Sequence, residues 1–173
     1  MHIIIDGYNL LGGLGKSFRR EGPFSEAARE SLLGELAAYR HRKGHPLTVV
    51  FDGWQQGQPS EGREHRAGVH VVYSKRGERA DQVIQRLARQ YGADCAVVSS
   101  DHEIINTANA HGAIVMTVQE FAAKLHHESS SGDMVHKELD TGDDIPRRSP
   151  EKKGNPRKLP KALRRRARQL KRF

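Results

Sequence analysis

The sequence predicts an α/β fold with a central, mostly parallel sheet of about five strands and helices on both of its faces. The first observation behind this prediction is that short apolar runs rich in β-branched residues alternate with longer amphipathic segments, an order that gives parallel pairing. The second is that this alternation stops near residue 127, where polar, charged and proline-bearing sequence follows. We therefore expect one folded domain over residues 1–127.

The expected strands are short apolar runs that end in polar or glycine residues. In chain order they are His2–Asp6, Leu47–Phe51, Val69–Tyr73, Ala96–Val98 and Ile114–Met116.

The expected helices carry apolar residues at helical spacing. The first begins after Ser25, a suitable N-cap, and ends before Gly44. The others cover about residues 80–91, 103–110 and 119–127. Residues 7–22 and 54–68 are expected to be loops, because the first stretch is glycine-rich and the second is polar.

Charge is divided unevenly along the chain. Residues 145–173 contain thirteen Lys and Arg and one acidic residue, a net charge of +12, whereas residues 1–144 contain 16 basic and 20 acidic residues, a net charge of −4. We expect residues 128–158 to be a polar flexible linker and residues 159–173 to be a basic tail that is able to form a short helix. Such a tail usually binds a polyanion, most often nucleic acid, and the alternative is a solubilising arm.

The single cysteine, Cys95, excludes an intramolecular disulfide and a cysteine-based zinc site. The apolar run at the start of the chain is too short for a signal peptide, and no segment approaches membrane-spanning length. We expect a cytoplasmic protein with no membrane partner. The glycine-rich residues 12–15 and the following Lys16 lack the spacing of a phosphate-binding loop, so no nucleotide cofactor is expected.

Four aspartates mark the edge of the sheet where function is predicted: Asp6, Asp52, Asp81 and Asp101. Three of them lie at or just after the ends of predicted strands, and Asp81 opens a predicted helix. Ligands bind at this edge of open parallel sheets, and carboxylates that meet there repel one another unless they bind hard divalent cations. The pattern predicts a Mg2+ or Mn2+ site and an enzyme that acts on phosphodiesters.

Each aspartate alone also has an ordinary structural explanation. Asp101 is placed to cap a helix, Asp52 precedes a glycine as in many turns, and Asp81 suits the positive end of a helix dipole. Asp6 is harder to explain in this way, because it directly follows three isoleucines. The four together favour a shared metal site.

The chain contains, in order, the blocks Ile4–Leu10, Val49–Gly53, Val71–Ser74, Ala80–Asp81, Val97–Asp101 and His111–Ala113. These blocks resemble NYN domains, relatives of the PIN nucleases, and more narrowly their YacP-like branch. The resemblance covers roughly residues 2–127. It implies a PIN-like three-layer α/β/α sandwich and the activity of a metal-dependent endoribonuclease.

The resemblance also implies roles for single residues. The implied metal ligands are Asp6, Asp81 and Asp101. Asn9 is expected to orient Asp6 or a water, and Asp52 is a further catalytic candidate that acts through water. Ser100 is expected to hold a ligand or a substrate phosphate.

Aromatic and basic residues are expected to border the carboxylates: Trp54, Arg63 and Arg66 from the predicted loop, and Lys75 and Arg76 just before Asp81. Stacking rings and positive charges suit single-stranded RNA, so these residues are the predicted substrate contacts. The alternative for the loop is a plain solvated surface.

Two function classes stay open, and within the enzyme class a DNA-directed flap or repair nuclease of related fold is a further alternative, which would be expected to carry an added DNA-gripping domain. The first is an endoribonuclease that cuts single-stranded RNA, with mRNA or ribosome-associated RNA as its target and the ribosome as a further partner. The second is a non-catalytic RNA- or ribosome-binding adaptor on a PIN-like fold. The complete set of four acids argues against the adaptor, because a degenerate site is expected to lack at least one of them.

Overall fold

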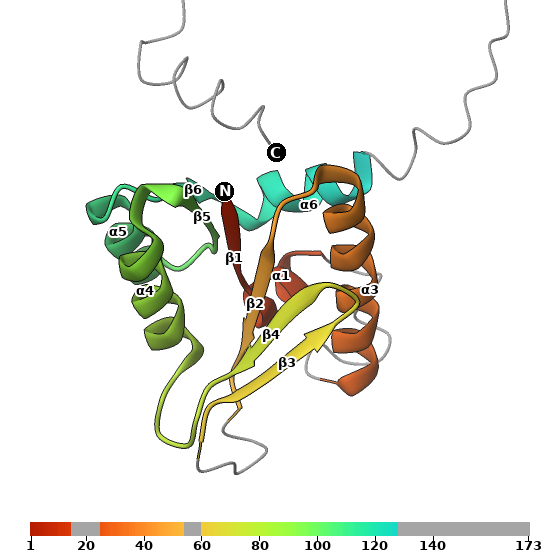
Figure 1. Ribbon diagram of the computed structural model, residues 1–173, viewed down its shortest axis with the longest axis horizontal. Coiled ribbons are helices and arrows are strands. Elements are labelled where there is room, and N and C mark those ends of the chain that lie inside the picture. The colour runs from red at the N-terminus through yellow and green to blue at the C-terminus, as the bar shows by residue number, and fades with distance from the viewer. Residues whose placement is uncertain (15–24, 54–59, 128–173) are drawn as a thin grey trace, which may run out of the picture. The chain divides into compact units, whose positions relative to one another are not determined.

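The computed structural model describes residues 1–14, 25–53 and 60–127 (Figure 1). Its strands are β1 (His2–Asp6), β2 (Leu47–Phe51), β3 (Gly62–Arg66), β4 (Val69–Tyr73), β5 (Cys95–Val98) and β6 (Ile114–Met116). Its helices are α1 (Gly7–Gly13), α3 (Glu26–Lys43), α4 (Ala80–Tyr91), α5 (His102–Ala110) and α6 (Val118–His127), with a 3-10 turn at Gly92–Asp94. The predicted linker (128–158) and basic tail (159–173) lie outside the described residues.

The strands form one sheet in the order β3-β4-β2-β1-β5-β6. All neighbouring pairs are parallel except β3 and β4. β1 is central, with β2 on one side and β5 on the other, so the chain order reverses beside it. The predicted mostly parallel sheet is confirmed, and its switch point, where such sheets bind ligands, lies between β1 and β5.

Helices cover both faces of the sheet (Figure 1). On one face α1, α3 and α6 pack together, and Tyr39 of α3 meets Phe121 of α6 edge to face at a ring distance of 5.2 Å. On the other face α4 and α5 pack against each other, and α4 lies over β1, β2 and β5. The predicted three-layer α/β/α arrangement is confirmed.

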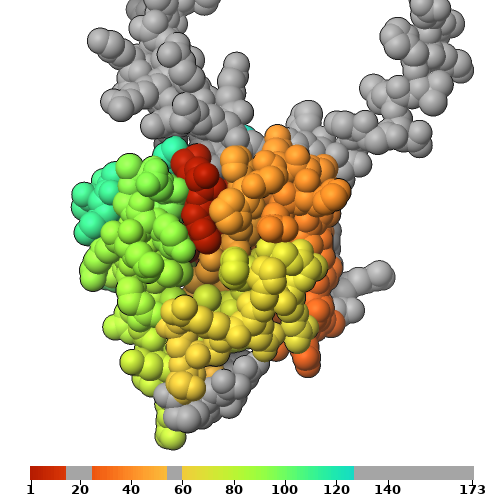
Figure 2. Space-filling view, viewed as in Figure 1, coloured from red at the N-terminus to blue at the C-terminus, as the bar shows by residue number. Residues whose placement is uncertain are grey.

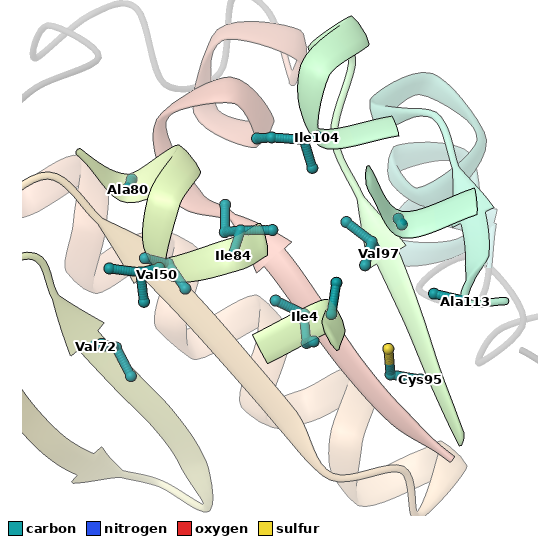
Figure 3. Close-up of a cluster of buried hydrophobic side chains, with 12 residues drawn as sticks. Ile4, Val50, Val72, Ala80, Ile84, Cys95, Val97, Ile104 and Ala113 are labelled. Atoms are coloured by element: carbon teal, nitrogen blue, oxygen red, sulfur yellow. The ribbon is translucent and has the colours of Figure 1, made fainter. Parts of the chain in front are cut away.

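The core beneath α4 comes from alternate positions of four strands. Figure 3 shows Ile4, Val50 and Val97 near Ile84 of α4, with Val72 farther out on β4 in the same cluster. Their burial is the main local source of stability, at roughly 25 cal/mol for each Å² of apolar surface removed from water. Because strand side chains alternate between faces, the side chains two positions farther along β1, β2 and β5 reach the same face at the edge of the sheet.

The expectation of a loop over residues 7–22 is wrong for residues 7–13, which form α1. Two glycines of α1 are required by close packing, whereas a Cβ atom added at Gly12 would meet nothing within 4 Å. A Cβ atom added at Gly7 would collide with the ring of Phe51, and one added at Gly13 would collide with Val118. Residues 15–22 lie outside the described residues.

The expectation of a loop over residues 54–68 is wrong for residues 62–66, which form the edge strand β3. Every β3 residue is polar or glycine and most are exposed, so the strand has no alternating apolar pattern to reveal it. Its turn into β4 has positive φ at both Ala67 (48°) and Gly68 (85°), as a two-residue type I′ hairpin requires. Trp54, in the remaining part of this stretch, lies outside the described residues.

The state of Cys95 and the character of the helices can be compared with the predictions from the sequence. Cys95 is a free thiol buried in the core, where burial raises its pKa to about 11. Among the helices of the described ranges, none has both the length and the apolar character that a membrane crossing needs.

Candidate functional site

Asp6 lies at the C-terminal end of β1 and is also the N-cap of α1. Its Oδ1 accepts a hydrogen bond from the backbone amide of Asn9 at 3.1 Å, and its Oδ2 accepts one from Ser99 Oγ at 3.4 Å. The residue is only 7% exposed. Burial raises the pKa of the Asp6 carboxyl from 3.8 to about 6; the Asn9 amide lowers this pKa and the charge of Asp81 raises it.

Ser99 connects three of the predicted site residues. Its fully buried hydroxyl donates to Asp6, accepts from the Asn9 side-chain amide at 3.3 Å, and accepts from the backbone amide of Asp101 at 3.1 Å. It therefore fixes the end of β5 to the end of β1. Ser100, the serine predicted from the sequence as a site residue, is exposed. The signal that identifies Ser99 is its register: β1 and β5 pair Ile4 with Val97, so Ser99 follows on the same face as Asp6.

Asp101 is the N-cap of α5, as the structural alternative predicted. Its Oδ1 accepts hydrogen bonds from the amides of Glu103 at 2.7 Å and Ile104 at 3.3 Å. A carboxylate has about four lone-pair positions on two oxygens, so these bonds orient the group and leave acceptor capacity for water, metal or substrate. Capping and site roles are thus compatible in one residue.

Asp52 follows β2 and ties the end of that strand to the start of α4. Its Oδ1 accepts from the Ala80 amide at 2.7 Å and from Ser74 Oγ at 3.4 Å, and Ser74 Oγ in turn accepts from the Gly53 amide at 3.0 Å. Ala80 is the first residue of α4. Asp52 therefore fixes the position of Asp81, the next residue, and its own part in catalysis stays a prediction.

Asp81 lies in the first turn of α4 and is half-buried. Burial raises the pKa of its carboxyl; the ion pair with Arg79, at 2.7 Å, lowers it, and the charges of Asp101, Asp52 and Glu103 raise it in that order. Because Asp52 accepts from the amide of Ala80, the neighbouring Asp81 lies at the edge of the sheet where β2 ends. The structure thus brings together Asp6, Asp52, Asp81 and Asp101 at one edge of the sheet, as the sequence predicted; we call them the carboxylate cluster.

The chemistry of the carboxylate cluster fits a hard divalent cation. Two of its members have raised pKa values, because burial and neighbouring carboxylates oppose their negative charge. Across residues 1–14, 25–53 and 60–127, no three His, Cys, Asp or Glu side chains stand ready to hold one ion by themselves. An ion at the cluster would therefore have at most two of these side chains as direct ligands and would need water or substrate to complete its shell, which Mg2+ accepts.

The predicted substrate contacts are divided between two ends of the sheet. Lys75 and Arg76 are exposed in the segment between β4 and α4, beside the carboxylate cluster. Arg63 is exposed on β3 opposite Val72, and its Nε pairs with Glu61 at 2.7 Å. Arg66 pairs with Glu30 and Glu64 opposite Val69, at the start of β4, and so lies at the far edge from the cluster.

A family model described as the YacP-like NYN domain matches residues 3–170, and the chain belongs to this family. The resemblance found in the sequence is confirmed. The uncharacterized protein YacP of Bacillus subtilis (strain 168) is 32% identical over 88 residues, which are 50% of this chain. That alignment covers 51% of YacP, so the chain spans about half the length of the curated relative it matches.

Two solved structures have the same fold. The crystal structure of a mutant of Rae1 (YacP) from Bacillus subtilis superposes with a TM-score of 0.60 at 26% identity, over 74% of this chain and 76% of that one. A second crystal structure of Rae1 (YacP) gives a TM-score of 0.59 at 22% identity, over 75% of each chain. The PIN-like fold is confirmed, and membership in the family is consistent with a nuclease-type function related to RNA.

Proposed function

We propose that this member of the YacP-like NYN domain family is a Mg2+- or Mn2+-dependent endoribonuclease that hydrolyses phosphodiester bonds in single-stranded RNA. The observation that carries the proposal is the carboxylate cluster at the switch point. The raised pKa values of Asp6 and Asp81 mean that the folded protein destabilises the negative charge of these two carboxylates. Such a cost is typical of sites that bind a cation and a reacting group.

We assign Asp6, Asp81 and Asp101 to the metal and water around it. A bound ion of this kind lowers the pKa of a water nucleophile and offsets charge at phosphorus. The other residues position these three. Asn9 and Ser99 hold the Asp6 carboxyl through its two oxygens, and Asp52 holds the first turn of α4, which carries Asp81.

The substrate strand is proposed to pass over exposed Lys75 and Arg76, whose charges pair with phosphates on either side of the scissile bond. Ser100, exposed beside Asp101, is a further phosphate contact, and Trp54 and Arg63 are proposed to contact bases and backbone. An unpaired strand is favoured because an A-form duplex hides its base faces from stacking side chains.

The basic tail is proposed to supply most of the long-range attraction for RNA. Residues 1–144 carry a net charge of −4, so they repel a polyanion overall, whereas residues 145–173 carry +12. Counterion release from RNA by such a segment adds affinity without sequence preference. This division suits a protein that acts in the cytoplasm on mRNA or ribosome-associated RNA, with the ribosome as a further partner.

The test is cleavage of an unstructured RNA by the full chain. Cleavage is expected with Mg2+ or Mn2+ and is expected to stop with EDTA. Asp81→Asn should remove most of the rate. The matched control is Asp94→Asn, because Asp94 is an exposed aspartate in the turn after α4, away from the cluster.

Full activity of Asp81→Asn, or activity that survives EDTA, would contradict the proposal. If the wild-type chain binds RNA tightly but never cuts it with any divalent cation, the adaptor function replaces the enzyme. Binding measurements on the same samples therefore separate the two function classes.

A further inference from the structure

A concave site lies on the face of the sheet that α4 covers, toward the end of α4 away from Asp81. The site is a cavity of about 230 Å³ between α4 and the β3–β4 hairpin. α4 packs on β1, β2 and β5, and leaves this part of the sheet face uncovered. Figure 2 shows the surface between α4 (green) and the hairpin (yellow), with the start of β1 (red) at its upper end. We call this site the ring groove.

Four rings from four different elements form a row, and three of them, His2, His70 and Tyr91, line the ring groove. Tyr91 of α4 stacks on His2 of β1 at a ring distance of 4.6 Å and an interplanar angle of 24°. His2 lies 6.5 Å from His70 of β4, at 28°. His70 is in turn 4.6 Å from His65 of β3, at 48°.

A hydrogen bond holds the His2 ring in place, and burial favours the neutral form of His2 and of His70. The His2 Nε2 atom lies 2.7 Å from Thr48 Oγ1, which fixes the tilt of the ring. Burial and the neighbouring His70 lower the pKa of His2, and burial and His65 lower the pKa of His70. Neutral rings of this kind offer flat π faces, which are the surfaces on which bases stack.

The walls of the ring groove combine apolar and polar groups. Val83 and Leu87 of α4, four residues apart and so on one side of the helix, line one wall together with Tyr91. Val72 and His70 of β4 line the other. Arg63, whose side chain is 73% exposed, lies at the rim, where its Nε pairs with Glu61 at 2.7 Å. Glu61 and Glu64 also line the groove, so only the part of the Arg63 guanidinium that faces away from Glu61 can meet a phosphate.

The size of the cavity limits the ligand to about one planar ring system. An apolar cavity of about 150 Å³ holds a benzene molecule, and pockets for drug-sized ligands begin at roughly 300 Å³. A volume of about 230 Å³ lies between these values and suits a single nucleobase. A phosphate alone would gain nothing from the rings, and a folded protein partner needs a much larger surface.

We propose that the ring groove binds one unpaired nucleobase, which stacks on the exposed row around His70 with its phosphate toward Arg63. The inference rests on the proposed function for the source of that base, namely an RNA strand. A free nucleotide offers the same chemistry and is the second source to be tested.

The ring groove extends the substrate contact along α4. Asp81 is the second residue of α4 and Tyr91 is the last, so at 1.5 Å per residue the two lie about 15 Å apart along the axis. Val83, in the wall of the groove, is two residues from Asp81. A base held in the groove therefore belongs to a nucleotide a short distance along the strand from the bond that is cut.

The experiment uses the full chain in EDTA, so that no RNA is cut. NMR signals of the His2, His70 and Tyr91 rings are followed while AMP, CMP or UMP is added, and then with a single-stranded RNA oligomer. Affinity for the oligomer is measured by fluorescence anisotropy at high salt, where the contribution of the basic tail is small. The variants are His70→Ala, which removes an exposed ring, and His70→Phe, which keeps a ring; the control is His126→Ala, on exposed His126 of α6.

Shifts of the three ring signals in the wild-type chain are expected. His70→Ala should weaken binding of the oligomer about 5- to 150-fold, the fold-change equivalent to removing one stacking ring. His70→Phe should bind like the wild type, and His126→Ala should be silent. Shifts with mononucleotides but not with the oligomer would identify a free nucleotide as the ligand. Duplex RNA of the same sequence should leave the ring signals unmoved.

Two results would overturn the inference: unmoved ring signals with every nucleotide and with the oligomer, or equal loss of affinity in His70→Ala and His70→Phe. Cleavage with Mg2+ or Mn2+ is measured separately. If RNA is cut but the ring signals do not shift, the inference about the groove fails and the proposed function stands. If RNA is never cut but bases shift the ring signals, the proposed function fails and the groove still binds a base.

Discussion

Replacing Asp6 with asparagine should make the metal-free protein more stable at neutral pH while it abolishes RNA cleavage. Asp6 is 7% exposed, and burial raises the pKa of its carboxyl from 3.8 to about 6. The folded state therefore opposes the charge that this group carries at pH 7. An asparagine side chain has nearly the same shape without the charge, so the Asp6→Asn variant removes the cost and keeps the packing.

The size of this effect follows from the pKa change. A factor of ten in proton affinity is worth about 1.4 kcal/mol, so a rise from 3.8 to about 6 corresponds to about 3 kcal/mol above pH 6. Asparagine can still accept from the Asn9 amide. Ser99 Oγ already accepts two hydrogen bonds, from Asn9 and Asp101, so it has no lone pair left for a new amide donor. Loss of the bond between residue 6 and Ser99 subtracts about 1 kcal/mol. We expect a net gain of about 1–3 kcal/mol.

The pH dependence has a definite sign. The folded-state pKa of Asp6 lies above its unfolded value, so its contribution to stability is fully present below pH 3.8 and is lost as the pH rises through about 6. His2 and His70 act in the opposite direction, because their pKa values are lowered and the folded state loses stability as the pH falls below 6.5. Both proteins contain these histidines, so the difference between wild type and variant isolates Asp6.

The assay is urea unfolding, followed by circular dichroism in EDTA at several pH values between about 4 and 8. The stability advantage of Asp6→Asn should be near zero at the acid end and grow as the pH rises. Added Mn2+ should then stabilise the wild type by mass action, by about 2.7 kcal/mol at one hundred times its dissociation constant, and the variant by much less. Asp94→Asn is the control. A variant that is less stable than wild type at pH 7.5 in EDTA, or equally stabilised by Mn2+, would refute the reasoning.

Four further outcomes are expected. Ser99→Ala should lower the cleavage rate and reduce the free energy of unfolding in urea by about 1–3 kcal/mol, because Asp6, Asn9 and Asp101 lose the hydroxyl that they share. An unchanged cleavage rate would show that this hydroxyl is not needed for activity. Asp52→Ala should reduce the free energy of unfolding by about 0.5–2 kcal/mol, whereas Asp52→Asn keeps the hydrogen bond to the Ala80 amide and should lose less. Equal unfolding midpoints for these two variants would contradict the anchoring role of Asp52. Deletion of residues 145–173 should flatten the salt dependence of RNA affinity without lowering the melting temperature of the domain. Trp54→Ala should weaken single-stranded RNA binding by roughly 1–3 kcal/mol, and equal cutting of duplex and single strand would count against a stacking role.

The sequence was sufficient to place the carboxylates because parallel strands bring their C-terminal ends to one edge. Asp6 and Asp101 follow β1 and β5, which are neighbours, and Asp52 follows β2 on the other side of β1. The structural and the functional explanations of these residues proved compatible. Asp6 and Asp101 are helix N-caps, and the same hydrogen bonds that cap the helices orient the carboxylates at the site.

The sequence was insufficient where a contact depends on register or on exposure. β3 has no apolar face, because it is an exposed edge strand, and periodicity cannot detect such a strand. Ser99 and Ser100 are equally polar, and only the pairing of β1 with β5 shows which one is buried. Glycines in α1 look like loop residues until the positions of Phe51 and Val118 are known.

The ring groove was missed for a related reason, since its members come from separate elements. His2, Thr48 and His70 lie in β1, β2 and β4 on the face that also carries Ile4, Val50 and Val72. α4 covers the middle of this face and leaves polar groups at both ends, the carboxylate cluster at one and the ring groove at the other. A nuclease that held only the scissile phosphate would need the first end alone. The rings at the second end are explained if the RNA strand is bound at two points, with phosphodiester cleavage at the carboxylate cluster and one base bound in the ring groove farther along α4.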